Sequence, residues 1–409
     1  MTQFSCDCSR KSVDPFCSAS LRRRKDAVRA GPSAQVTDPR RRLVSTRSLE
    51  LPFFFHPASS GYKMTLQFLM SLILPGLCSA AISCYGDHGQ PVDWFIVYKL
   101  PRLDHTPEAG IKYMYQDSNS KGWLHGASLM NDTESAVGRT LSQLYQSSDS
   151  KDVAYVLYND QPPASVSNAI RGHTKGVVLL DKNQGFWLIH STPHFPPSSS
   201  QKYDWPSNAF HNGQSFICVT YPYAQFRDIG TQLMYNTITP YDSSIPDTFS
   251  SDLPDLTSAA MKKQVTKPPW NRQITLTSVG GKQFTSFAKH ARFGDDLYSG
   301  WVSTVLKSDL CVQFWLNSRG ILPSNCSLSY HTYDIQNISF DSSVSYSSHI
   351  DHSKWCVTWS DTPGWACIGD MNRDFEEMQR GGGTLCTSDP MIWKSFKILV
   401  FNYSKCSKV

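Results

Sequence analysis

An internal repeat constrains the fold of this chain more strongly than any other feature of the sequence. Residues 173–194 and 352–373 align without gaps. The identical pairs are His173/His352, Lys175/Lys354, Val178/Val357, Gly185/Gly364 and Ile189/Ile368. Each segment predicts a strand, a glycine-containing turn and a second strand. The repeat therefore predicts two related halves, each with one His-x-Lys pair at the start of a hairpin.

The spacing within each pair places both side chains on one face. A His-x-Lys pair alone carries little information, and a single histidine is ordinarily a structural residue. In a strand, however, residues i and i+2 point the same way, so His173 projects with Lys175 and His352 projects with Lys354. If the halves pack about a pseudo-twofold axis, two histidines and two lysines converge on one cleft.

Such a cluster suits cleavage of a phosphodiester without a metal or other cofactor. One imidazole attacks phosphorus, and the other protonates the departing oxygen. The lysines neutralise the non-bridging oxygens as charge develops. The two histidines must then be in opposite protonation states, which an acidic compartment and their mutual repulsion provide.

The rest of the chain predicts a mixed α/β (α+β) fold. Apolar spacing predicts helices over 135–145 and 295–306. Runs of β-branched and aromatic residues predict strands at 93–98, 154–158, 176–180, 186–190, 216–221 and 356–359. The stretch 240–270 is rich in Pro, Ser and Asp. We therefore expect an N-terminal half at 82–245, a linker at 246–270 and a C-terminal half at 271–409.

The net positive charge of the chain comes from its first 63 residues. They hold 12 Lys and Arg against 5 Asp and Glu, out of 39 and 34 in the whole chain. The remainder thus has 27 basic and 29 acidic residues, a net charge of −2, which argues against a basic nucleic-acid binder at neutral pH. Residues 1–63 lack apolar periodicity, so we expect an extension that is unstructured or not translated.

Residues 64–81 have the pattern of a secretory signal peptide. Met64 follows a lysine and precedes the apolar run 66–77, and small residues complete the segment up to Ala81. We expect the chain to start at Met64 and to be cleaved near Ala80 or Ala81, with an uncleaved anchor as the alternative. No later apolar run approaches the roughly 18 residues of a membrane helix, so we expect no stable membrane association.

The cysteines and sequons agree with an oxidising compartment. Eight cysteines follow the predicted signal peptide, and none forms a paired CxxC arrangement, which favours disulfides over a structural zinc site. Sequons predict N-glycosylation at Asn131, Asn325, Asn337 and Asn402.

Several sequence blocks together resemble the deoxyribonuclease II family. They are CYGDHGQPVDWFIVYKLP (84–101), YNDQPP (158–163), GHTKG (172–176), WLIHSTPHFPP (187–197), GDDLYSGW (294–301), ILPSNCS (321–327), DHSKWC (351–356), CIGDMNR (367–373) and RGGGTLC (380–386). The resemblance runs from Cys84 to Cys406. It implies a lysosomal, and additionally secreted, acid endonuclease that cleaves double-stranded DNA without a divalent metal. Its products carry 3′-phosphate and 5′-hydroxyl ends, its fold is a phospholipase D-like pseudodimer, and DNA is its partner. Whether the chain is a monomer or a homodimer stays open.

The resemblance also implies individual roles. It makes the two His-x-Lys pairs catalytic and marks His190 as a further important histidine. Asn372 resembles the asparagine of the phospholipase D GSxN element, which helps to hold a phosphate oxygen. The wider superfamily has an aspartate five residues beyond the lysine, but this sequence has Leu180 and Trp359 there. The carboxylate that orients the histidine is therefore unassigned.

The implied disulfides are Cys84–Cys218, Cys326–Cys406 and Cys367–Cys386, which leave Cys311 and Cys356 over. A nucleophilic thiol at Cys356 is conceivable, but we expect this residue to pack as a small buried hydrophobe.

Two other functional classes remain open. A secreted non-catalytic DNA-binding protein could keep the fold, although such a protein is expected to lose dyad residues. A zinc-dependent hydrolase could use His173, His190, His194 and His352, but two of these are four apart in a Pro-containing loop rather than on a helix.

Overall fold

The structure is a computed structural model that describes residues 81–163 and 171–406. The predicted extension at 1–63 and the signal peptide at 64–81 lie outside the described residues, apart from Ala81. Within the described ranges, no helix has the length and apolar character needed to cross a membrane.

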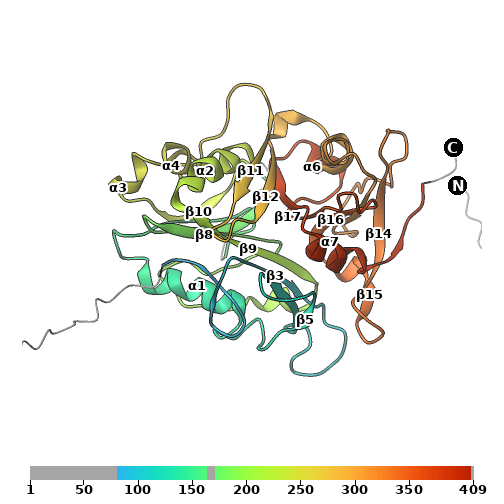
Figure 1. Ribbon diagram of the computed structural model, residues 1–409, viewed down its shortest axis with the longest axis horizontal. Coiled ribbons are helices and arrows are strands. Elements are labelled where there is room, and N and C mark those ends of the chain that lie inside the picture. Colours follow the sequence, from blue (N-terminus) through green and yellow to red (C-terminus); the bar gives the residue numbers. More distant parts are fainter. Residues whose placement is uncertain (1–80, 164–170, 407–409) are drawn as a thin grey trace, which may run out of the picture. The chain divides into compact units, whose positions relative to one another are not determined.

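The described residues form two large sheets, one from each half of the repeat (Figure 1). The first has eight strands in the order β10 (Pro240–Ser244), β6 (Ala154–Asn159), β7 (Lys175–Leu180), β8 (Gln184–His190), β9 (Gln214–Pro222), β3 (Trp94–Lys99), β4 (Tyr113–Asp117) and β5 (Leu124–His125). The second has nine: β11 (Asn271–Thr277), β12 (Gln283–Lys289), β18 (Gly382–Thr387), β17 (Ala366–Gly369), β16 (Lys354–Thr358), β13 (Leu310–Gln313), β14 (Thr332–Ser339) and β15 (Ser345–Ser347), with β19 (Val400–Tyr403) also on β14. A small ribbon pairs β1 (Cys84–Tyr85) with β2 (Pro91–Val92).

Both sheets contain the same order of five strands. It is β3-β9-β8-β7-β6 in the first sheet and β12-β18-β17-β16-β13 in the second. The repeated hairpins occupy equivalent places in it, as β7–β8 and β16–β17. All six predicted strands are present, but β7 and β16 begin at Lys175 and Lys354. His173 and His352 lie two residues earlier, just before these strands. Their backbone N–H groups donate to loops of the other half and not to a neighbouring strand.

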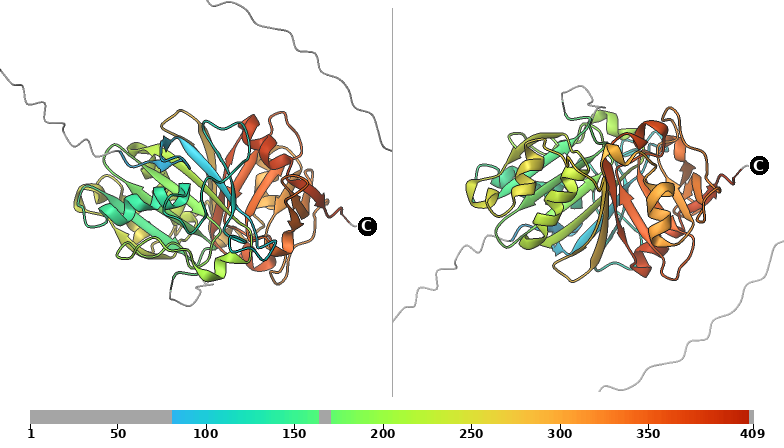
Figure 2. Two further views of the ribbon diagram at one scale, coloured as in Figure 1. Left: turned by 90° about the horizontal axis from the view of Figure 1, so that it is seen from below. Right: turned by 90° about the horizontal axis from the view of Figure 1, so that it is seen from above.

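The two sheets lie side by side (Figure 2). They share a core, and each also has a second buried face. Alternate residues of one strand enter different clusters, so Val178 belongs to the shared core and Val177 to the outer core of the first sheet. In the second sheet, Trp355 faces the shared core and Cys356 lies in the buried outer core of that sheet. This burial on both sides explains why the strands are almost continuously apolar.

Some helices contribute side chains to the shared core, and others pack on the outer faces of the sheets. The helices and helical turns are α1 (Ala136–Ser147), α2 (Phe226–Tyr235), α3 (Asp247–Ser250), α4 (Pro254–Ala260), α5 (Ser303–Leu306), α6 (Phe375–Met378), α7 (Pro390–Lys397), the 3₁₀ turns η1 (Ser207–Phe210), η2 (Tyr223–Gln225), η3 (Ala291–Phe293) and η5 (Ser348–Ile350), and the π-helical turn η4 (Tyr298–Val302). The helix predicted at 135–145 is confirmed as α1. The one predicted at 295–306 is shorter, comprising η4 and α5.

The stretch expected to be a linker, 246–270, is folded at its start. It contains α3 and α4, and Phe249 of α3, Leu256 of α4 and Leu253 between them are buried in the shared core. These apolar residues follow no long periodic pattern, so the sequence did not distinguish two short helices from a loop.

The three implied disulfides are confirmed: Cys84–Cys218, Cys326–Cys406 and Cys367–Cys386. In the described part of the chain Cys311 and Cys356 are free and buried, as expected for Cys356. Burial raises the pKa of the Cys356 thiol above its ordinary value, which disfavours the thiolate that a nucleophile needs.

Candidate active site

Each histidine of the repeat is held by a loop of the other half. We name these the clamp loops: residues 191–213 between β8 and β9, and residues 370–381 between β17 and β18. The N–H of His173 donates to Gly381 O at 2.9 Å, and the N–H of His352 donates to Gly213 O at 2.8 Å. This reciprocal exchange brings both dyads to the junction between the sheets.

Glycines allow segments of the two halves to approach closely at this junction. A Cβ atom on Gly172 would lie 1.9 Å from Asn236 O in the same half and 2.9 Å from Gly381 O in the other. One on Gly213 would lie 2.7 Å from the Asp351 carboxyl group of the other half. A larger residue at either position would push a histidine away from its clamp loop.

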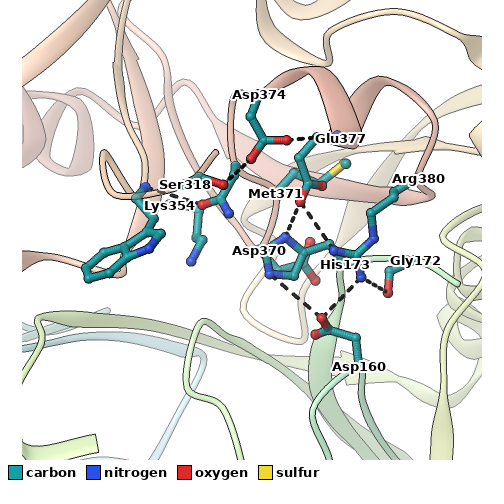
Figure 3. Close-up of polar contacts among 12 residues, drawn as sticks. Asp160, Gly172, His173, Ser318, Lys354, Asp370, Met371, Asp374, Glu377 and Arg380 are labelled. Carbon is teal, nitrogen blue, oxygen red and sulfur yellow. Dashed lines mark hydrogen bonds and ion pairs between the residues drawn. The ribbon is translucent and has the colours of Figure 1, made fainter. Parts of the chain in front are cut away.

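The His173 ring lies between two carboxyl groups (Figure 3). Its Nδ1 is 2.5 Å from Glu377 Oε1, and its Nε2 is 4.0 Å from Asp160 Oδ2. Glu377 belongs to α6, where its N–H donates to the N-cap carboxylate of Asp374 at 3.0 Å. The helix start therefore fixes the backbone of Glu377, while its side chain reaches across to the other half.

Lys175 and Arg380 surround the same carboxyl groups. Lys175 Nζ is 2.5 Å from Asp160 Oδ1. Arg380 Nη2 is 3.1 Å from Asp160 Oδ2 (Figure 3). Arg380 Nη1 also lies 3.4 Å from Glu377 Oε1. The Lys175 N–H donates to Asp370 Oδ2 at 3.2 Å. Two cations and three carboxyl groups thus interlock around the first dyad.

The second dyad has a different setting. His352 Nδ1 lies 3.2 Å from Ser191 O and 2.9 Å from Lys354 Nζ, and its ring centre is 5.0 Å from that of Trp315. The backbone N–H of Trp315 donates to Asn372 Oδ1 at 3.3 Å. The side-chain amide nitrogen of Asn372 is thus left as a donor for another group. His352 therefore faces a carbonyl oxygen where His173 faces a carboxyl group.

The charged groups of each dyad affect the pKa of the histidine in the other dyad. Burial lowers the pKa of His173 well below its ordinary value, and the positive charges of Lys175, Arg380, Lys354 and His352 lower it further. Burial, followed by the charges of Lys354 and Lys175, lowers the pKa of His352 in the same way. Each dyad therefore lies near enough to the other for its charge to lower the pKa of the other histidine.

Burial also shifts the partners toward neutrality. It raises the pKa of Glu377 to about 8, against the opposing charge of Arg380. It lowers the pKa of Lys354 to about 7, and Lys175 lowers it further. The pKa of Asp370 is raised to about 7 for the same reason. Glu377 is thus already uncharged at neutral pH, and Lys354 and Asp370 each gain a proton as the pH falls through about 7.

Neither His190 nor His194 has a hydrogen bond to a dyad residue among the described contacts, although the charge of Lys175 adds to burial in lowering the pKa of His190. The buried His190 ring stacks on Phe216 with centroids 5.5 Å apart, and its Nδ1 accepts from the Thr192 N–H at 3.1 Å. His194 Nδ1 lies 3.0 Å from Pro162 O. The four-histidine zinc set is therefore not assembled, and among the described residues no group of three His, Cys, Asp or Glu could hold a metal ion.

The sequence did not point to the charged residues around His173. Asp160 lies in the YNDQPP block, so a signal for it was present in the resemblance. Glu377 lies three residues after Asp374, which is the spacing of a helix capping box and predicts a structural role. No pattern singled out Arg380.

A comparison with known families identifies the chain at this point. The family model for Deoxyribonuclease II matches residues 83–406. The chain belongs to the deoxyribonuclease II family. Its resemblance to that family in the sequence blocks is thereby confirmed, and it is a deoxyribonuclease II-type nuclease.

Individual deoxyribonuclease II relatives align over nearly their whole length. Deoxyribonuclease-2-alpha of Mus musculus is 49% identical over 351 residues, which cover 84% of this chain and 98% of the relative. Deoxyribonuclease-2-beta of Homo sapiens is 41% identical over 83% of this chain and 96% of its own. Plancitoxin-1 of Acanthaster planci is 38% identical over 80% and 94%.

Proposed function

We propose that this protein is an acid endonuclease that hydrolyses double-stranded DNA without a divalent metal and leaves 3′-phosphate and 5′-hydroxyl ends. One observation carries the proposal: two His-x-Lys pairs share a buried cluster, but only His173 has a carboxyl group on its Nδ1. This asymmetry distinguishes the nucleophile from the general acid among two otherwise equivalent histidines.

His173 is the nucleophile. With its Nδ1 hydrogen-bonded to Glu377, the ring attacks phosphorus through Nε2. The Glu377 carboxyl group has a pKa of about 8 and is uncharged at acidic pH, so it orients the ring by accepting a hydrogen bond from Nδ1. A P–N bond forms as the P–O5′ bond breaks. His352 donates its proton to the departing 5′ oxygen.

Water then completes the reaction. His352, now neutral, takes a proton from water as the water oxygen attacks phosphorus. The P–N bond breaks, which restores His173 and releases the 3′-phosphate. Lys175, Lys354 and the amide nitrogen of Asn372 stabilise the non-bridging oxygens in both steps.

The pKa shifts support activity at acidic pH. Attack requires neutral His173, whose pKa is lowered well below 6.5. Protonation of the leaving group requires charged His352, whose pKa is lowered in the same direction. Lys354 has a pKa of about 7 and becomes an ammonium ion below it. The competent combination therefore forms as the pH falls below neutrality.

The arrangement of the sheets supports a phospholipase D-like pseudodimer. The five-strand order occurs in both sheets, and each histidine donates its N–H to a glycine of the opposite clamp loop. We assign residues 82–245 and 271–409 to the two halves. The folded stretch 246–270 connects them.

We further propose a lysosomal location reached through the secretory pathway, with secretion as a second route. The disulfides and the predicted signal peptide support an oxidising compartment. Glycans at the four sequon asparagines belong to the same proposal: Asn131 and Asn402 are exposed, and Asn325 and Asn337 are partly exposed.

A plasmid assay tests the reaction. The secreted protein should cleave supercoiled DNA at pH 5 and much less at pH 7.5, with unchanged rates in EDTA, because lysines supply the charge that a metal otherwise provides. A phosphatase should release phosphate from the 3′ ends of the products, whereas a kinase should label their 5′ ends without prior dephosphorylation.

Three results would contradict the proposal. Loss of activity in EDTA with recovery on adding zinc or magnesium would favour a metal-dependent hydrolase. Products with 5′-phosphate ends would exclude a 5′-hydroxyl leaving group. DNA binding without cleavage at any pH would favour the non-catalytic alternative.

A further inference from the structure

Two buried lysines occupy equivalent places behind the dyads. Lys99 is the last residue of β3, and Lys289 is the last residue of β12. These strands hold the same position in the shared five-strand order, and neither lysine side chain is exposed. Neither belongs to a His-x-Lys pair, and the proposed reaction uses neither.

Each lysine binds the clamp loop of its own half through backbone carbonyl groups. Lys289 Nζ donates to Glu377 O at 2.7 Å, to Met378 O at 3.3 Å and to Arg380 O at 2.8 Å. Lys99 Nζ donates to Ala209 O at 2.6 Å and to Phe210 O at 3.3 Å. In both halves the ammonium group satisfies carbonyls at the end of a short helical turn, α6 or η1.

The clamp loops carry the groups that orient the histidines. The loop held by Lys289 presents Glu377 Oε1 and Gly381 O to His173. The loop held by Lys99 presents Ser191 O and Gly213 O to His352. Each lysine is therefore linked to the histidine of the opposite half through one loop.

A buried ammonium ion is costly unless it is fully hydrogen-bonded. Burial lowers the pKa of Lys99 to about 7 and that of Lys289 to about 8. Both are therefore protonated at the acidic pH of the proposed reaction. A neutral apolar side chain would fill the same space more cheaply, so the recurrence of lysine at both positions points to the hydrogen bonds.

We propose that Lys99 and Lys289 are a matched pair of positioning residues, each of which holds a clamp loop so that its carbonyl and carboxyl groups orient the histidine of the opposite half. The inference rests on the proposed function. It assigns Lys289 to the nucleophile His173 and Lys99 to the acid His352.

Two substrates with different leaving groups distinguish the role of Lys289 from that of Lys99. Supercoiled plasmid DNA needs the acid because its leaving group is an alkoxide. The p-nitrophenyl ester of thymidine 3′-phosphate does not, because nitrophenolate leaves without a proton. The first turnover is measured at pH 5 with both substrates for Lys99→Met and Lys289→Met. Lys99→Gln and Lys289→Gln, which keep a donor, carry the same test if a methionine variant is not secreted.

Lys289→Met should slow both substrates by about 100-fold, since misplacing a reacting group by about 1 Å costs that much. Lys99→Met should slow DNA cleavage by about 100-fold and release of nitrophenolate by less than about threefold, because only the former uses the general acid. The glutamine variants should show the same substrate pattern with smaller losses.

Lys282→Met is the matched control. Lys282 lies just before the opposite end of β12 and pairs with Asp389, so this variant should retain wild-type rates with both substrates. Equal losses on the two substrates for Lys99 variants, or losses below about threefold for Lys289 variants, would overturn the inference. A wild-type protein that cleaves DNA only with added metal would instead overturn the proposed function.

Discussion

Replacing His173 or His352 with alanine should lower DNA cleavage by about 10⁴-fold or more, because residues that act as one catalytic unit cannot replace each other. His173→Ala removes the atom that bonds to phosphorus, and His352→Ala removes the proton donor. Single-turnover plasmid nicking at several acidic pH values measures the loss. The two variants should differ on the nitrophenyl ester, where His352→Ala should retain far more of the first turnover than His173→Ala.

His349→Ala is a suitable control for this experiment. His349 lies three residues before His352, is exposed and has its Nδ1 3.1 Å from the Ser347 hydroxyl. We expect wild-type cleavage and secretion from this variant. Near wild-type turnover by either dyad variant at any pH would refute the two-histidine mechanism.

Glu377→Met should lower kcat by about 10³-fold with little change in KM, because methionine has a similar length but cannot accept the hydrogen bond from His173 Nδ1. The ring would lose the hydrogen bond that stabilises its charged form, so the pKa of this histidine would fall further. The limb of the pH–rate profile that reports deprotonation of His173 should therefore move to lower pH. The profiles of kcat for both proteins measure this shift.

Glu376→Met provides the matched control, since Glu376 is the exposed neighbour on the same short helix. It makes the same replacement on α6 without touching His173. A Glu377→Met enzyme within threefold of wild type, or one with an unshifted profile, would show that Glu377 does not act through His173.

The hairpins could be predicted because their information is local. Short runs of apolar residues and a central glycine determine where a strand can run and turn, and the repeat shows that the same unit occurs twice. The family resemblance adds the disulfide pairs, which spacing alone does not determine. The structure confirms the strands, α1 and all three disulfides.

The setting of each histidine could not be predicted, because it depends on residues far away in the sequence. Glu377 is 204 residues from His173, and Arg380 is 220 residues from Asp160. Within its own segment, Glu377 has the spacing of a helix cap and Lys99 is the end of an apolar strand. Neither pattern indicates a partner across the junction of the sheets.

The sequence by itself thus determined the repeated His-x-Lys hairpins, the apolar strands and the family, since side-chain alternation and motif order are properties of short segments. Only the tertiary structure decided which histidine meets a carboxyl group and which meets a carbonyl oxygen. The two segments are alike in sequence, but the clamp loops that contact them differ: α6 presents Glu377 to one, and Ser191 presents its backbone oxygen to the other. The packing of non-identical loops therefore makes two similar motifs chemically different.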